Sequence, residues 1–189
     1  KSANQDYTRA LSIDPKVGMS GTIYYFRGQN RGIEGDIQGA CVAFVGDGSS
    51  NVCQSWVHAA SMMNFELRVG APGEYHPRPE LVSSAGKHCR LTTSPQDAVA
   101  GADLVITDTW AGMGQEAEKA QRLDALADFQ VNEDLMATAS PDALFMHCLP
   151  AYRGQEVSAG VLEGPQSVVW DEAENRLHAQ KALIELLMA

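Results

Sequence analysis

Two glycines follow an aspartate in the block DTWAGMGQE at 108–116, a pattern that could bind a small polar substrate. Glycines let backbone groups approach a ligand closely, because they have no side chain. Asp108 could therefore pair with the ammonium group of a substrate. An aspartate that stabilises a tight turn also accounts for the same residues.

A second block, FMHCLPAYRG at 145–154, places His147 beside Cys148 near the end of a predicted strand. Cys148 could act as a nucleophile, although a buried and unreactive cysteine is the more common situation. Adjacent strand residues point to opposite faces of a sheet, so His147 and Cys148 are poorly placed to act as a dyad. Pro150 ends the pairing of the strand and can impose a cis bond after Leu149.

The block GDGSSN at 46–51 lies between a predicted strand and a predicted helix. It matches the start of a dinucleotide-binding fingerprint, with Glu66 about 20 residues downstream, but Asn51 replaces the third glycine. Backbone amides at this helix start could instead bind an anionic group such as a carboxylate. Ser50 or Asn51 can cap the helix, and capping is the simpler role for Asn51.

The fourth block, WDEAENRLHAQKAL at 170–183, is expected to place Arg176 one turn into a helix. Acidic residues at a helix start interact favourably with the helix dipole, which by itself explains much of the pattern. Arg176 could also face the strand ends, where its guanidinium would donate to a carbonyl or phosphate oxygen.

Strands and helices alternate along the chain from residue 41 onward. The expected strands are 41–47, 66–72, 88–94, 104–109, 143–148 and 167–172. The expected helices are 50–63, 78–86, 95–102, 116–128, 131–139 and 174–188. This order predicts an α/β fold with a doubly wound, mainly parallel sheet and helices on both faces. A site is expected at the carboxyl ends of the strands, which carry Asp47, Gly48, Thr107, Asp108, His147, Cys148 and Asp171.

Composition excludes several classes of protein. The net charge of −10 disfavours nucleic-acid binding, because a negative surface repels phosphates. No apolar run approaches the roughly 18–20 residues that a membrane helix needs. The four cysteines form no C-x-x-C pair, so we expect reduced thiols, no zinc site and a cytoplasmic protein.

Taken together, the blocks FVGDGSSNVCQSW, TDTWAGMGQEAE, FMHCLPAYRGQEV and VVWDEAENRLHAQKAL strongly resemble the ornithine-binding half of ornithine carbamoyltransferases. The resemblance covers residues 36–189. It implies carbamoyl transfer from carbamoyl phosphate to the side-chain amine of L-ornithine, giving citrulline and phosphate in arginine biosynthesis. It also implies two α/β domains, no metal or organic cofactor, and a homotrimer.

On the ornithine side, the resemblance implies that Asn51 holds the α-carboxylate or α-amino group and that Asp108 binds the amino end. Met113 would contact ornithine through its backbone. Gly112 stands where the family usually has a serine, so a hydrogen bond to ornithine is missing and weaker ornithine binding is expected.

On the carbamoyl side, the resemblance places Cys148 near the attacking amine and the backbone carbonyl of Leu149 against the carbamoyl group. Arg176 would polarise the carbamoyl carbonyl, and His147 would have a supporting role. Cys148 need not form a covalent bond in this chemistry.

The phosphate loop S-T-R-T and the block H-P-x-Q of the family's other domain are missing from the sequence. Residues 1–35 would be a remnant of that domain or pieces joined across gaps. We therefore expect the 189-residue chain to be inactive alone and to belong to a longer enzyme. The alternatives are a non-catalytic amino-acid-binding module or inactive truncated paralogue and, on the incomplete glycine fingerprint, a nucleotide-binding oxidoreductase.

Overall fold

In the computed structural model of the protein, the described residues are Ile37, 39–111 and 116–188. Gln38–Val169 form one compact unit, and the chain from Trp170 onward belongs to a second. The leading segment 1–35 and the loop positions Gly112 and Met113 lie outside the described residues. The domain boundary at residues 35/36 stays a prediction.

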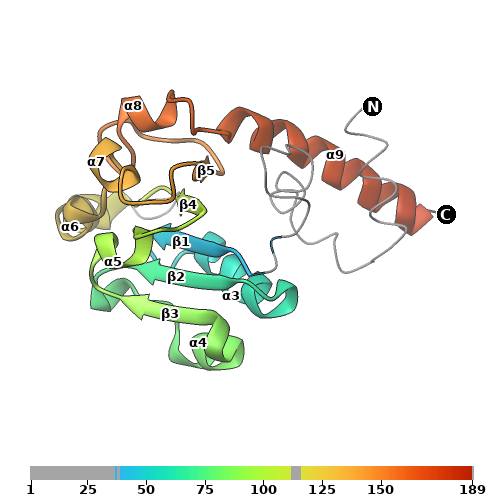
Figure 1. Ribbon diagram of the computed structural model, residues 1–189, viewed down its shortest axis with the longest axis horizontal. Helices are drawn as coiled ribbons and strands as arrows, with labels where there is room; N and C mark the ends of the chain where they lie inside the picture. Colours follow the sequence, from blue (N-terminus) through green and yellow to red (C-terminus); the bar gives the residue numbers. More distant parts are fainter. Residues whose placement is uncertain (1–36, 38, 112–115, 189) are drawn as a thin grey trace. The chain divides into compact units, whose positions relative to one another are not determined.

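Five parallel strands form the sheet of the larger unit in the order β3–β2–β1–β4–β5 (Figure 1). They are β1 (Cys41–Val45), β2 (Glu66–Gly70), β3 (Cys89–Thr92), β4 (Leu104–Thr107) and β5 (Leu144–His147). The chain builds outward from β1 to β3 and then returns to the other side of β1. The strand order therefore reverses between β1 and β4, the point at which doubly wound sheets bind ligands.

Helices and helical turns connect the strands. The α-helices are α3 (Asn51–Met63), α4 (Pro79–Ala85), α5 (Pro95–Val99), α6 (Lys119–Leu126), α7 (Glu133–Met136), α8 (Ala159–Leu162) and α9 (Val169–Met188). The 3-10 turns are η2 (Gly73–Tyr75), η3 (Gly86–His88), η4 (Glu116–Glu118) and η5 (Ala127–Phe129). None of the helices within the described ranges is long and apolar enough to cross a membrane.

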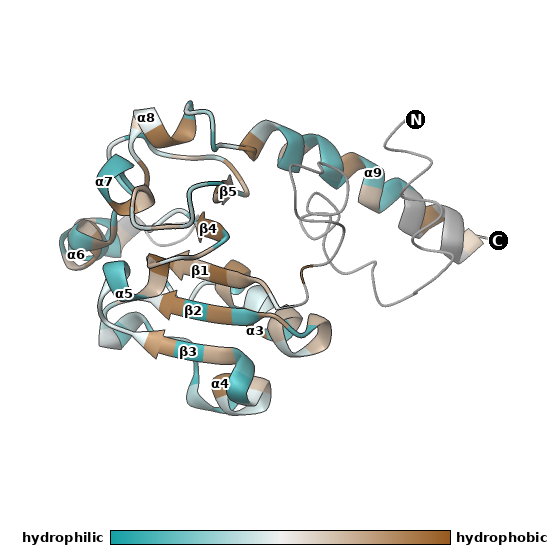
Figure 2. Ribbon diagram, in the orientation of Figure 1, coloured by the Kyte–Doolittle hydropathy of each residue, from teal (hydrophilic) through white to brown (hydrophobic). Residues whose placement is uncertain are grey.

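Both faces of the sheet are covered, as the sequence predicts. Ala43 and Phe145 belong to one buried cluster that also contains residues of α5, α7 and α8. Because side chains alternate along a strand, Phe44 faces the opposite side, where Trp56 of α3 contacts Phe65 edge to face with ring centroids 6.0 Å apart. β1 is apolar along its length (Figure 2) because it is buried on both faces.

The expected sixth strand at 167–172 is wrong. Only Ser167 forms a bridge to β5, through Phe145, and α9 begins two residues later. Asp171 and Glu172 lie in the first turn of α9, where carboxylates stabilise the positive end of the helix dipole. Val168 and Val169, just before them, are buried, whereas Trp170 is exposed, and this apolar run that resembled a strand leads into the helix.

Candidate functional site at the carboxyl edge of the sheet

The ends of β1 and β4 are held together by a buried side chain. The hydroxyl group of Thr107 donates a hydrogen bond to the carbonyl oxygen of Val45, over 2.6 Å. Asp108 follows directly and is partly buried, and its Oδ1 accepts the backbone N–H of Thr109 at 2.8 Å. The carboxylate therefore lies at the mouth of the two strands where the strand order reverses.

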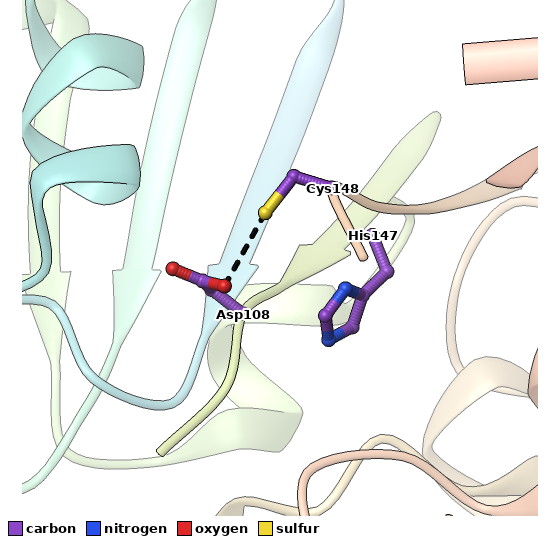
Figure 3. Close-up of side chains that lie close together, drawn as sticks. All are labelled: Asp108, His147 and Cys148. Atoms are coloured by element: carbon purple, nitrogen blue, oxygen red, sulfur yellow. Dashed lines mark hydrogen bonds between the residues drawn. The ribbon is translucent and has the colours of Figure 1, made fainter. Parts of the chain in front are cut away.

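Cys148 at the end of β5 contacts this carboxylate. Its thiol donates to Oδ1 of Asp108 across 3.3 Å, and Cys148 is exposed. Figure 3 shows the thiol directed toward Asp108 while the ring of His147 lies to one side. His147 is fully buried. The donor atoms of His147 and Cys148 nevertheless lie within 4.8 Å of each other, so the expectation that the two are poorly placed as a dyad stays a prediction. The thiol itself bonds the carboxylate of Asp108.

The ring of His147 is hydrogen-bonded on both sides. Its Nδ1 accepts the backbone N–H of Leu149 at 2.9 Å, so Nε2 carries the ring proton and donates to Oε1 of Glu156 at 3.3 Å. Glu156 is fully buried and also accepts the N–H of Tyr152. His147 and Glu156 therefore fix the loop that presents Cys148 and Leu149.

Leu149 has an uncommon backbone conformation. Its φ angle is +53°, in the left-handed region, and the peptide bond to Pro150 is cis as predicted. The hydrogen bond from its own N–H to His147 holds it there. Sequence reasoning placed Leu149 in the site but missed Glu156, because an acidic residue in a polar loop gives no sign of burial.

Asp108, His147 and Cys148 also form a possible set of metal ligands. The donor atoms of the three side chains lie within 4.8 Å of one another. Both ring nitrogens of His147 are already hydrogen-bonded within the protein. A metal would have to displace the bond to Leu149 or the bond to Glu156, so the arrangement fits a metal poorly.

The start of α3 is capped by Ser50, one of the two residues expected there. Ser50 is the N-cap, and its side chain accepts the N–H of Cys53 at 3.1 Å. The capping role expected for Asn51 is therefore wrong: Asn51 is the first helical residue and is exposed. The amide of Ser49 donates to the carboxylate of Asp47 at 2.9 Å, so this amide is already engaged within the chain.

Glu66 does not support dinucleotide binding. It is the first residue of β2 and pairs in register with Cys41, the first residue of β1, so it lies at the amino edge of the sheet. Its carboxylate accepts Nε of Arg68 at 2.9 Å. An acidic residue that binds a ribose would have to lie at the carboxyl edge, with the other site residues.

Arg176 lies on α9, in the second unit. Because α9 begins at Val169, Arg176 is about two turns into the helix and not one turn as the sequence indicated. Its side chain is exposed.

We expect thiol reagents to label Cys148 first in the folded protein. Burial raises the pKa of Cys89 to about 11 and raises that of Cys53 well above its usual value. Only the thiolate reacts, so at about pH 8 roughly one Cys89 thiol in a thousand is reactive. Labelling followed by peptide mass mapping checks this, with Cys148→Ser as the variant that should lose the fast phase. Equally fast labelling of Cys53 would contradict the buried position of that residue.

Comparison with known proteins shows which protein family the chain resembles. A family model described as aspartate/ornithine carbamoyltransferase, Asp/Orn binding domain, matches residues 38–187. An ornithine carbamoyltransferase of Methylococcus capsulatus is 62% identical over 154 residues, which are 82% of this chain and 51% of that protein. An anabolic ornithine carbamoyltransferase of Pseudomonas aeruginosa is 54% identical over 154 residues, 82% of this chain and 50% of that protein.

Comparison with solved structures points to the same family. The ornithine carbamoyltransferase of Burkholderia thailandensis superposes with a TM-score of 0.77 at 44% identity, covering 88% of this chain and 52% of that one. That of Pyrococcus furiosus gives a TM-score of 0.72 at 45% identity, covering 79% and 50%. The chain therefore spans about half the length of the relatives it matches.

Proposed function

The chain belongs to the aspartate/ornithine carbamoyltransferase family, and we propose that it is the ornithine-binding half of a longer ornithine carbamoyltransferase. The longer enzyme would transfer the carbamoyl group of carbamoyl phosphate to the side-chain amine of L-ornithine, releasing citrulline and phosphate in arginine biosynthesis. The observation that carries the proposal is the contact between Asp108, at the end of β4 where the order of the strands reverses, and Cys148, at the end of the neighbouring strand β5.

Ornithine would lie across the carboxyl ends of β1 and β4. The Asp108 carboxylate would pair with the ammonium group at the amino-acid end of ornithine. Asn51 at the start of α3 would hold the α-carboxylate or α-amino group, and the backbone of Met113 would be a further contact. The partly buried position of Asp108 supports this role, because a charge pair is stronger where water is partly excluded.

Transfer would take place beside Cys148. The neutral amine nitrogen would attack the carbamoyl carbon, the bond from that carbon to the phosphate oxygen would break, and the proton that the nitrogen loses would pass to the departing phosphate. Attack needs an amine and not an ammonium ion, so a site that favours the neutral form helps. The Leu149 carbonyl would hold the carbamoyl amide, and Arg176 would stabilise the charge that develops on the carbonyl oxygen.

Protection of Cys148 tests whether ornithine binds here. In the full-length enzyme, ornithine with carbamoyl phosphate should slow labelling of Cys148 at least several-fold, because the substrate amine lies against the thiol. Putrescine, which lacks the α-carboxylate, is the control and should protect less. Labelling that is unaffected by saturating ornithine would argue for a site elsewhere and against this assignment.

The proposal extends to assembly and location. By family resemblance the full-length enzyme would be a cytoplasmic homotrimer without a cofactor. A light-scattering mass of three subunits is the expected result, and a monomeric mass would contradict it. A non-catalytic amino-acid-binding module is the remaining alternative. A protein that binds ornithine but forms no citrulline would establish that alternative.

A further inference from the structure

A buried ion pair lies next to the segments of chain that carry the proposed ornithine contacts. Arg122 of α6 is only 6% exposed and Asp47 at the end of β1 is 4% exposed, and Nη2 of Arg122 donates to Oδ2 of Asp47. Removing two charges from water costs free energy, which the pair recovers only with good geometry and further hydrogen bonds. Those further contacts show what the pair holds in place.

Arg122 reaches three segments at once. Its Nε donates to the carbonyl oxygen of Trp110 at 2.6 Å, and its guanidinium lies over the ring of Tyr75, 5.0 Å from the centroid. Asp47, its ion-pair partner, accepts both the amide and the hydroxyl of Ser49, at 2.9 and 2.6 Å. The Arg122 side chain therefore joins the segment that follows β4 to the segment that follows β1.

The positions joined in this way flank the proposed substrate contacts. Trp110 comes two residues after Asp108, and Ser49 comes two residues before Asn51. Trp110 is itself buried and lies so close to Gly46 that a Cβ there would be 2.9 Å from Nε1. Trp110, in the segment that follows β4, is thus packed against the end of β1 and is also hydrogen-bonded to Arg122.

We propose that Arg122 is a positioning residue that sets the spacing between Asp108 and Asn51, and through it recognition of the amino-acid end of ornithine. The inference rests on the proposed function, because it takes these two residues as the substrate contacts. Arg122 would not touch the substrate. It would act by holding Trp110 and, through Asp47, Ser49.

The test uses Arg122→Met and Arg122→Lys in the full-length enzyme. In the methionine variant, KM for ornithine should rise roughly 10- to 100-fold, since small displacements of a site are costly. KM for carbamoyl phosphate should change less than about twofold, because Arg122 holds no group assigned to that substrate. The lysine variant keeps the charge but lacks the planar fork that bonds two partners, so it should lie between.

A matched control is available in the middle of β2. Arg68 also bonds a carboxylate, that of Glu66 at 2.9 Å, and a backbone carbonyl, that of Ala100 at 2.8 Å. Arg68→Met should leave both KM values unchanged. The preference for ornithine over putrescine, as a ratio of kcat/KM, should fall in the Arg122 variants and stay constant in the Arg68 variant.

The outcomes separate the two proposals. A wild-type enzyme that forms no citrulline from ornithine would refute the proposed function itself. An active wild type whose Arg122 variants keep the ornithine preference, or lose affinity for both substrates equally, would overturn the positioning role. If the methionine variant does not fold, the lysine variant decides: wild-type preference and wild-type KM for ornithine would then count against Arg122.

Discussion

Replacing Arg176 with alanine in the full-length enzyme is expected to lower kcat by about 10²–10³-fold, with a much smaller change in KM for ornithine. The carbamoyl oxygen gains negative charge as the amine attacks, and removing one fixed donor to such an oxygen typically has an effect of this size. The interaction strengthens in the transition state, so its loss appears mainly in kcat. Steady-state kinetics with both substrates varied measures the effect.

Lys181 provides the control for this variant, because it places another cation on an exposed position of α9. Lys181→Ala should leave kcat within about twofold of wild type, since its charge has no assigned role in the reaction. If the Arg176→Ala enzyme keeps the wild-type kcat, then Arg176 is only a residue near the acidic start of α9 and has no role in the reaction.

Replacing Asp108 with asparagine should reduce kcat/KM for ornithine by about 100-fold or more. The substitution keeps the shape of the side chain but removes the charge that would pair with the substrate ammonium, a loss of roughly 2–5 kcal/mol for close pairs. The thiol of Cys148 would still have an oxygen to donate to. Kinetic measurement with ornithine varied at saturating carbamoyl phosphate gives the ratio.

Asp142 serves as the matched control, because it is exposed and precedes β5 at the amino edge of the sheet. Asp142→Asn should behave as wild type. If Asp108→Asn also keeps full kcat/KM, then Asp108 is a turn aspartate that accepts the N–H of Thr109, the simpler interpretation of its sequence pattern.

The sheet could be predicted because its strands are buried on both faces. Such strands are nearly continuous apolar runs, as in Cys41–Val45 and Leu104–Thr107, and their alternation with helical patterns indicates parallel pairing. The positions of Asp108 and Cys148 followed from the same reasoning, since the carboxyl ends of parallel strands share one edge.

Other features depend on tertiary contacts that no local pattern reveals. Arg122 lies in a polar helical sequence that resembles a solvated face, yet it is buried because Asp47, far away in the sequence, pairs with it. Glu156 is buried because His147 and the loop that follows it supply donors. At 167–172 the sequence supported both a strand and an acidic helix start, and in the structure α9 begins at Val169 with Asp171 and Glu172 in its first turn.

The most direct test of the central claim is steady-state carbamoylation by the full-length enzyme with ornithine, putrescine, aspartate and N-acylated ornithine as competing amine substrates. Because Asp108 and Asn51 would together select an amino acid, we predict that ornithine has the highest kcat/KM and that the product is citrulline. A raised KM for ornithine that Gly112→Ser lowers is compatible with this result. A higher kcat/KM for aspartate, putrescine or an N-acylated ornithine would contradict the claim that this edge of the sheet is an ornithine site.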